Sequence, residues 1–88
     1  MFHKIKDIKP LKKYTLLATF QDDTIKTYDM TPLFTEIEAF NSLKSIPHLF
    51  EQVKVDTGGY GISWNDELDL SCDELWDNGI LLKASQTA

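Results

Sequence analysis

The chain has 88 residues, of which 42% are hydrophobic and 26% charged, with a formal net charge of −5 and no arginine. At this length we expect a single domain over residues 1–88 that buries about 60 to 65% of the surface its unfolded chain exposes. No apolar run approaches the roughly 20 residues that span a bilayer, and no signal-peptide core follows the N-terminus, so we expect a cytoplasmic protein with no membrane partner.

Charge is distributed unevenly along the chain. Five of the nine lysines lie within residues 1–13, whereas residues 56–77 hold seven carboxylates and no lysine. We therefore expect one basic and one acidic patch on the folded surface. Nucleic-acid binding by this chain alone is disfavoured, because arginine is the side chain best suited to bidentate contacts with phosphate and guanine.

The first 30 residues predict three strands. Ile5 and Ile8 are three positions apart, so the first strand, over about residues 3–9, is expected to be bulged and to end at Pro10. Apolar residues alternate over residues 14–20, and both faces of this second strand are fairly apolar, which indicates a central position. A turn in which Asp tolerates positive φ then leads to a third strand, over residues 25–30.

A helical segment follows the third strand. Thr31 before Pro32 is typical of an N-cap followed by a first-turn proline. One short amphipathic helix, interrupted at residues 41–42, is predicted by apolar residues at helical spacing: Leu33, Phe34, Ile37 and Phe40. A second helical piece is expected to begin at residues 46–47 and to direct three side chains at the core: Leu49, Phe50 and Val53.

Residues 53–64 predict a β-hairpin. Val53 and Val55 alternate with polar residues, residues 57–59 supply glycines that accept positive φ, and the alternation then resumes through Tyr60 to Trp64. We expect Trp64 to be at least partly buried and Tyr60 to be the more exposed of the two rings.

The best-marked helix start of the chain lies at Ser71. Its hydroxyl is expected to accept from the amide of Glu74, while the Glu74 carboxylate accepts from the amide of Ser71, which together form a capping box. An apolar stripe then faces inward, made of Cys72, Leu75 and Trp76. Gly79 is expected to end this helix in a left-handed conformation, residues 80–82 to pack, and residues 83–88 to form a frayed tail after a core of about residues 3–82.

Several short runs and single residues are similar to those of one known family. They are the run Tyr14–Phe20, Tyr28-Asp29-Met30, Pro32-Leu33, Phe40, Leu43, Phe50, Val53, Gly61-Ile62-Ser63-Trp64, Leu68-Asp69-Leu70-Ser71 and Leu75. Together they span about Ile5 to Asn78 and resemble the small bacterial family called domain of unknown function 2442. Two departures from its pattern are Asp23, where relatives usually have a turn Gly, and Asn65, where Pro often follows the Trp.

The resemblance implies a fold without implying a chemistry. The fold is α+β, with two layers: a mainly antiparallel sheet of about five strands and helices on one face, in the order β-β-β-α-β-β-α. Some relatives carry an appended DNA-binding helix-turn-helix, which we do not expect in this chain. Others are encoded beside a second small protein, in an arrangement similar to a toxin and antitoxin pair.

Metal binding is not expected from the acidic residues between positions 66 and 77. A calcium loop of the EF-hand type that began at Asn65 would need Gly at its sixth position, where the chain has Leu70. These carboxylates are more typical of a helix N-terminus. Asp69 is expected to accept from backbone amides in the turn that leads into the helix.

A soft-metal or nucleophilic site is also disfavoured. His3, His48 and Cys72 are the only soft metal ligands, and none lies within short-range ligand spacing of another. Cys72, with His48 as its base, could act as a nucleophile if the first helical turn lowered its pKa. Its place on the apolar stripe favours a buried packing residue instead. The run of residues 58–61 lacks the Lys-Ser/Thr of a phosphate loop, so we expect no cofactor.

These observations favour a non-enzymatic protein-interaction module that binds another small protein. Its expected interaction surface comprises Tyr60, Asp66, Glu67, Lys12 and Lys13. Its expected structural residues are Trp64, Asp69, Ser71, Glu74, Leu75 and Trp76. Two alternatives stay open: a small-ligand binder or enzyme that uses the acidic 66–77 region with His48 and needs a pocket there, and a component of a DNA-binding regulator. An uncovered sheet edge would favour a homodimer.

Overall fold

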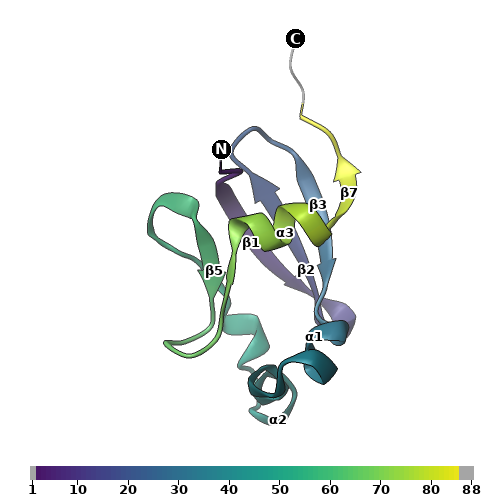
Figure 1. Cartoon of the computed structure of the whole chain (residues 1–88), viewed down its shortest axis with the longest axis vertical. Coiled ribbons are helices and arrows are strands. Elements are labelled where there is room, and N and C mark those ends of the chain that lie inside the picture. The colour runs from purple at the N-terminus through teal and green to yellow at the C-terminus, as the bar shows by residue number, and fades with distance from the viewer. Residues whose placement is uncertain (1, 86–88) are drawn as a thin grey trace.

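The computed structural model of the protein describes residues 2–85 and contains two antiparallel sheets. The larger has the strand order β1-β2-β3-β7 and the smaller the order β4-β5-β6. Figure 1 shows the helix α3 lying across one face of the larger sheet, with α1 and α2 together at its lower end. The predicted α+β class is therefore confirmed, but the seven strands form two sheets instead of the expected single sheet of about five.

The larger sheet is built mainly from the first 30 residues. Its strands are β1 (Ile5–Leu11), β2 (Thr15–Phe20), β3 (Ile25–Asp29) and β7 (Ile80–Lys83). The central position of β2 and the irregularity in β1, between Ile5 and Asp7, confirm two predictions. Pro10 does not end β1 as predicted, since it pairs with Leu16. A proline is tolerated there because β1 is an edge strand, where a missing N–H needs no partner in the sheet.

The turn between β2 and β3 has the predicted left-handed residue. Asp23 has a φ of 71° and stands where a glycine would be easiest to accommodate. The Asp22 carboxylate accepts from the amide of Thr24 at 2.9 Å, which closes the turn locally. Asp23 also accepts from Lys6 Nζ at 2.9 Å and so joins the turn to β1.

The helical segment is more broken than its sequence pattern predicts. It comprises α1 (Thr31–Glu36), a 3₁₀ helix (Glu38–Asn41), α2 (Ser42–Ser45) and a further 3₁₀ helix (Phe50–Gln52). Ile37 is extended and exposed, so the prediction of one continuous helix through Phe40 was wrong. The cause lies in Asn41, whose side-chain amide donates to the carbonyls of Phe34 and Glu38 that a continuous helix would use itself.

The start of α1 is capped by a residue that precedes the predicted cap. Asp29 Oδ1 accepts from both the amide and the hydroxyl of Thr31, at 3.0 and 2.9 Å. Thr31 is itself the first helical residue, so its predicted N-cap role was wrong, while the first-turn position of Pro32 is confirmed.

The smaller sheet contains the predicted hairpin and one strand that was not predicted. The hairpin consists of β4 (Lys54–Val55) and β5 (Gly61–Ser63), joined through a 3₁₀ turn (Thr57–Gly59) in which Gly58 and Gly59 have positive φ. The third strand is β6 (Asp69–Ser71), which pairs with β5 and leads directly into α3 (Cys72–Asn78).

The start of α3 uses half of the predicted capping box. Ser71 Oγ accepts from the amide of Glu74 at 3.1 Å, as predicted. The Glu74 carboxylate does not return to Ser71, which is the last residue of β6. It accepts instead from the hydroxyl of Tyr28 at 2.8 Å and from the side-chain amide of Asn78 at 2.9 Å. The acidic residue thereby attaches α3 to β3.

Gly79 ends α3 for a different reason from the one predicted. Its φ of −76° and ψ of 157° are extended, not left-handed. Glycine is required because a Cβ atom at this position would clash with the carbonyl oxygen of Leu75 and lie 3.3 Å from that of Thr27. The chain can therefore turn from α3 directly into β7 alongside β3.

The predicted core residues of the C-terminal half lie where the sequence places them. Trp64, Leu75 and Cys72 are buried, and Trp76 is partly buried against the same cluster. The indole Nε1 of Trp64 donates to the carbonyl of Phe50 at 3.0 Å, so its polar atom is satisfied. The buried aromatic and aliphatic residues of the helical segment and both sheets join in one core.

The predicted frayed tail is ordered over its described part. Lys83 belongs to β7, and Ser85 Oγ donates to the carbonyl of Asp22 at 2.7 Å, so the prediction of fraying from residue 83 was wrong as far as Ser85. Its remainder, 86–88, lies outside the described residues. Within residues 2–85, no helix has the length and apolarity needed to cross a membrane.

Candidate interaction surface

The five residues predicted as an interaction surface lie at three separate places. Tyr60 precedes β5, Asp66 and Glu67 follow the opposite end of that strand, and Lys12 and Lys13 form the turn between β1 and β2. Tyr60 has an exposed fraction of 49%, which confirms its predicted exposure. Its ring contacts Phe2 edge-on and lies under the ammonium of Lys4.

The loop that carries Asp66 and Glu67 is organised by Asn65. Its side-chain oxygen accepts from the amides of Glu67 and Leu68, both at 2.9 Å. This is the kind of role that we predicted for Asp69 in the turn before α3. Asp69 instead lies in β6, where its side chain is exposed, so that prediction was wrong. Asn takes the role because its short side chain reaches the amides two and three residues ahead.

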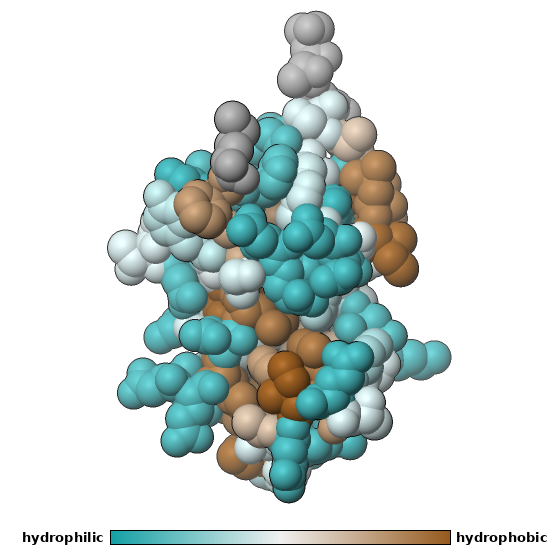
Figure 2. All heavy atoms as spheres, viewed as in Figure 1, coloured by the Kyte–Doolittle hydropathy of each residue, from teal (hydrophilic) through white to brown (hydrophobic). Residues whose placement is uncertain are grey.

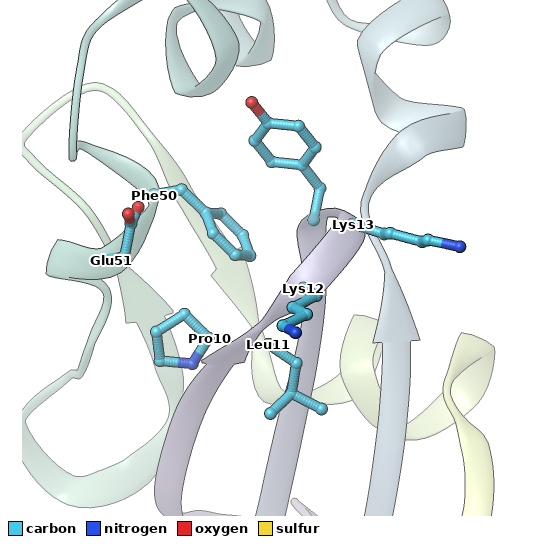
Figure 3. Close-up of a pocket in the computed structure, with 7 residues that line it drawn as sticks. Pro10, Leu11, Lys12, Lys13, Phe50 and Glu51 are labelled. Atoms are coloured by element: carbon cyan, nitrogen blue, oxygen red, sulfur yellow. The ribbon is translucent and has the colours of Figure 1, made fainter.

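Lys12 and Lys13 belong to a strained turn beside an open groove. Lys13 and Tyr14 have φ values of 59° and 54°, a conformation that costs non-glycine residues free energy. The groove has a volume of about 640 Å³, and its lining includes Pro10, Leu11, Tyr14 and Phe50. Figure 3 shows Lys13 pointing away from Phe50 and Glu51, so the two charged ends do not converge on one point.

The three soft metal ligands are far from forming one site. His3 stacks on Trp76 with ring centroids 3.6 Å apart, His48 is exposed with Nδ1 4.0 Å from Glu51, and Cys72 is buried. Burial, and next the nearby carboxylate of Asp73, raise the pKa of the Cys72 thiol above its usual value. The possibility that the first helical turn lowers the pKa of Cys72 was therefore wrong. The predicted role of Cys72 as a buried packing residue is confirmed.

Among the acidic residues of α3, Glu74 stabilises the fold through its hydrogen bonds to neighbouring side chains. Burial, and then the hydrogen bond and charge of Glu74, raise the pKa of the Tyr28 phenol well above its ordinary value. Glu74 is thus held between Tyr28 and Asn78. Among residues 2–85, no three His, Cys, Asp or Glu side chains gather closely enough to hold a metal ion.

The most distinctive surface feature is β7, which the sequence pattern did not identify as a surface. Ile80, Leu81 and Leu82 have exposed fractions of 70, 57 and 64%. Figure 2 shows them as a continuous apolar column along one side of the molecule, at the position of β7 in Figure 1. We call these three residues the β7 edge. The prediction that residues 80–82 pack inside was therefore wrong.

The β7 edge is open for further pairing. The strand β7 pairs with β3 on one side, and no other strand in the described part of the chain pairs with its second side. A register shift leaves Leu82 without a partner residue on β3, so β7 is bulged there. An edge strand presents outward N–H and C=O groups to any strand that approaches. The three exposed apolar residues therefore accompany unpaired backbone groups.

The two ends of the β7 edge differ in charge. Near Ile80 lies a groove of about 370 Å³, which we call the acidic groove because its lining includes the carboxylates of Asp29, Glu36 and Glu74. Lys83 lies at the other end, where β7 pairs with Ile25. The strand β7 therefore runs from an acidic to a basic end over four residues.

The sequence carried only a weak signal for this surface. Three apolar residues after a helix-ending glycine fit a buried strand as well as an exposed one. The distinction depends on which strand lies beside β7, and that is β3, some 50 residues earlier in the chain. The polar sequence that follows, from Lys83 onward, was the only local indication of a surface position.

The model of one protein family matches most of the chain. The family model described as Protein of unknown function (DUF2442) matches residues 5–80 of the chain, from β1 to the first residue of β7. Comparison with curated proteins and with solved structures gave no match. The match confirms the resemblance found in the sequence motifs, and it assigns no chemistry to any residue.

Proposed function

The chain belongs to the family of proteins of unknown function DUF2442, and we propose that it is a non-enzymatic protein-interaction module that binds another protein through the β7 edge. The observation that carries the proposal is the exposure of three successive large apolar residues on an unpaired strand: Ile80, Leu81 and Leu82. Soluble domains usually protect such strands, so an unprotected one marks a binding surface.

The mode of binding follows from the chemistry of a sheet edge. An extended segment of another protein adds a strand by forming main-chain hydrogen bonds with the free side of β7. The apolar side chains of the β7 edge contribute burial, at roughly 25 cal/mol for each Å² removed from water. The acidic groove near Ile80 and the ammonium of Lys83 orient the incoming strand by charge.

Two of the groups that an enzyme could use, Glu74 and Cys72, are engaged in the fold. The Glu74 carboxylate accepts two hydrogen bonds from neighbouring side chains, and burial raises the pKa of the Cys72 thiol, which keeps it protonated. The helix α2, which His48 follows in the sequence, lies at the lower end of the molecule, whereas the acidic helix α3 crosses the larger sheet above it (Figure 1). These positions support binding in preference to catalysis.

A second small protein is the first candidate for the bound molecule. The sequence motifs resemble a family in which some members are encoded beside such a protein, in a pair similar to a toxin and its antitoxin. A short strand or a flexible terminus of that second protein would fit beside β7, a strand of four residues.

The test is affinity capture from an extract of the source organism with three immobilised forms of the protein. Leu81→Lys places a charge at the centre of the β7 edge, where it opposes strand addition. Ile46→Lys is the matched control, because Ile46 is an exposed apolar residue, at 49%, outside any strand. We expect a protein to be retained by the wild type and by Ile46→Lys, and lost with Leu81→Lys. Equal retention by all three forms, or no retention by any, would contradict the proposal.

A further inference from the structure

We propose that one protein bound at the β7 edge is a second copy of this chain, paired antiparallel to the first across a two-fold axis at Leu81. This inference rests on the proposed function and names its partner. Two four-stranded sheets would then form one continuous sheet of eight strands. Two-fold pairing of identical edges is the simplest closed assembly, because one surface patch serves both copies.

The apolar residues of the β7 edge are complementary to themselves in this register. With the axis at Leu81, each Leu81 faces the Leu81 of the second copy, and each Ile80 faces a Leu82. Every exposed large apolar side chain of β7 thereby meets another one. Cross-strand apolar pairs stabilise an antiparallel pair of strands, and in the isolated chain these three side chains have no such neighbours on the outer side.

The charges at the two ends of β7 are complementary in the same register. Lys83 of the second copy would face Gly79, between Asn78 and Ile80, which both line the acidic groove. Its ammonium would thus lie beside a groove whose carboxylates are Asp29, Glu36 and Glu74. The two Lys83 residues would be roughly 14 Å apart along the strands, so they would not oppose each other.

Few features of β7 prevent the approach of a second strand. Residues 79–82 contain no proline and no charge, which are the usual means of blocking a sheet edge. The bulge at Leu82 is the one irregularity, and it follows the residue on which the proposed pairing is centred. The hydrogen bond from Ser85 to Asp22 holds the end of β7 against its own sheet.

The affinity is expected to be modest because β7 is short. Four residues in each copy place the interface near the lower end of specific protein interfaces, below about 1,200 Å² of total buried area. We therefore expect a monomer–dimer equilibrium with a dissociation constant on the order of micromolar, equivalent to about −8 kcal/mol. The dimer would dissociate when a protein with a better-fitting strand binds the same edge.

The first experiment is sedimentation velocity of the full chain over a concentration series through the micromolar range. We expect the wild type and Ile46→Lys to change from monomer to dimer as concentration rises, and Leu81→Lys to remain monomeric. Circular dichroism and a thermal melt confirm that each variant is folded. A wild type that stays monomeric throughout the series, or a Leu81→Lys variant that dimerises like the wild type, would overturn the inference.

A second experiment tests the register and does not depend on a destabilising charge. Residues that face each other across an antiparallel pair have Cα atoms about 4.5 to 5.5 Å apart, which a disulfide can bridge. We expect Leu81→Cys to form a covalent dimer under mild oxidation, and Ile80→Cys not to do so, since it would face Leu82. The native thiol of Cys72 is buried, so the wild type should not cross-link. Cross-linking of Ile80→Cys without that of Leu81→Cys would overturn the proposed register.

The two proposals fail in different ways. If the wild type is monomeric but captures another protein that Leu81→Lys loses, the β7 edge is a binding surface and the second copy is not its ligand. If Leu81→Lys alters neither capture nor sedimentation, both proposals are wrong.

Discussion

The two edges of the larger sheet differ in how well they are protected from pairing with another strand. At one edge, β1 carries charged residues and Pro10, and the smaller sheet lies against it: a Cβ atom on Gly59 would approach the carbonyl oxygen of Ile5 to 2.5 Å. At the other edge, β7 carries the exposed residues Ile80, Leu81 and Leu82, and no strand in the described part of the chain pairs with its outer side.

The contrast shows which edge the fold protects. A sheet edge that binds nothing is normally covered, charged or interrupted by proline, because exposed backbone groups invite aggregation. The edge at β1 has all three protections, and the edge at β7 has only a bulge. Since the same small domain protects one edge so thoroughly, the exposure of the other supports the proposal that β7 binds another strand.

The largest effect is expected from opening the protected edge. Gly59→Ala places a methyl group against the backbone of Ile5 at a residue with a φ of 80°, so the turn of the smaller sheet must move away from β1. We expect the free energy of unfolding to fall by about 2 to 4 kcal/mol, measured by urea denaturation.

The matched control for this substitution is Gly58→Ala. Gly58 has a similar φ of 83°, but an added Cβ would meet only the side chain of Tyr60, at 2.9 Å. We expect a smaller loss of about 1 kcal/mol, chiefly from the left-handed backbone. Equal losses for the two alanines would contradict the close packing of the smaller sheet on β1.

An intermediate effect is expected where α3 is attached to the β7 side of the sheet. Tyr28→Phe removes the hydrogen bond to Glu74 and should lower the free energy of unfolding by about 1 kcal/mol at neutral pH.

The pH dependence supplies an independent check of that attachment. Burial and Glu74 raise the pKa of Tyr28 in the folded state, so its contribution to stability is complete below the unfolded pKa of about 10 and is lost as pH rises further. Above that pH, the wild type should lose stability more steeply than Tyr28→Phe. Parallel pH profiles for the two proteins would show that the Tyr28 phenol is not held as the structure places it.

The smallest effect on folding is expected at the open edge. Leu81 is more than half exposed, so Leu81→Lys should change the free energy of unfolding of the monomer by no more than about 0.5 kcal/mol. Urea denaturation at a concentration below that of dimerisation provides the measurement. A loss of several kcal/mol would mean that Leu81 packs inside the isolated chain, and the β7 edge would then not be a binding surface.

Features fixed by neighbouring residues could be predicted from the sequence. Asp23 takes a positive φ, Ser71 caps α3, and the glycines after Asp56 form the hairpin turn, because each depends on residues only a few positions away. The burial of Leu75 could also be predicted, since it lies on the apolar stripe of a helix whose start was known.

Features that depend on distant partners could not be predicted. The three-residue strand β6 forms because β5 lies beside it, about eight residues earlier in the chain. Ile37 fits a helical pattern, but Asn41 ends that helix by binding its carbonyls. Within the predicted surface, the exposure of Tyr60 was correct, whereas the β7 edge was missed because an apolar triplet is compatible with either side of a sheet.

Hydrogen–deuterium exchange, measured at low and at high protein concentration, tests the difference between the two edges most directly. If β7 is an open edge that pairs with a second strand, the amides of residues 81–83 should exchange more slowly as concentration rises, while those of residues 6–9 in β1 keep the same rates. Exchange rates in β7 that do not depend on concentration, or that change equally in β1, would contradict the pairing of β7 with a second copy of the chain.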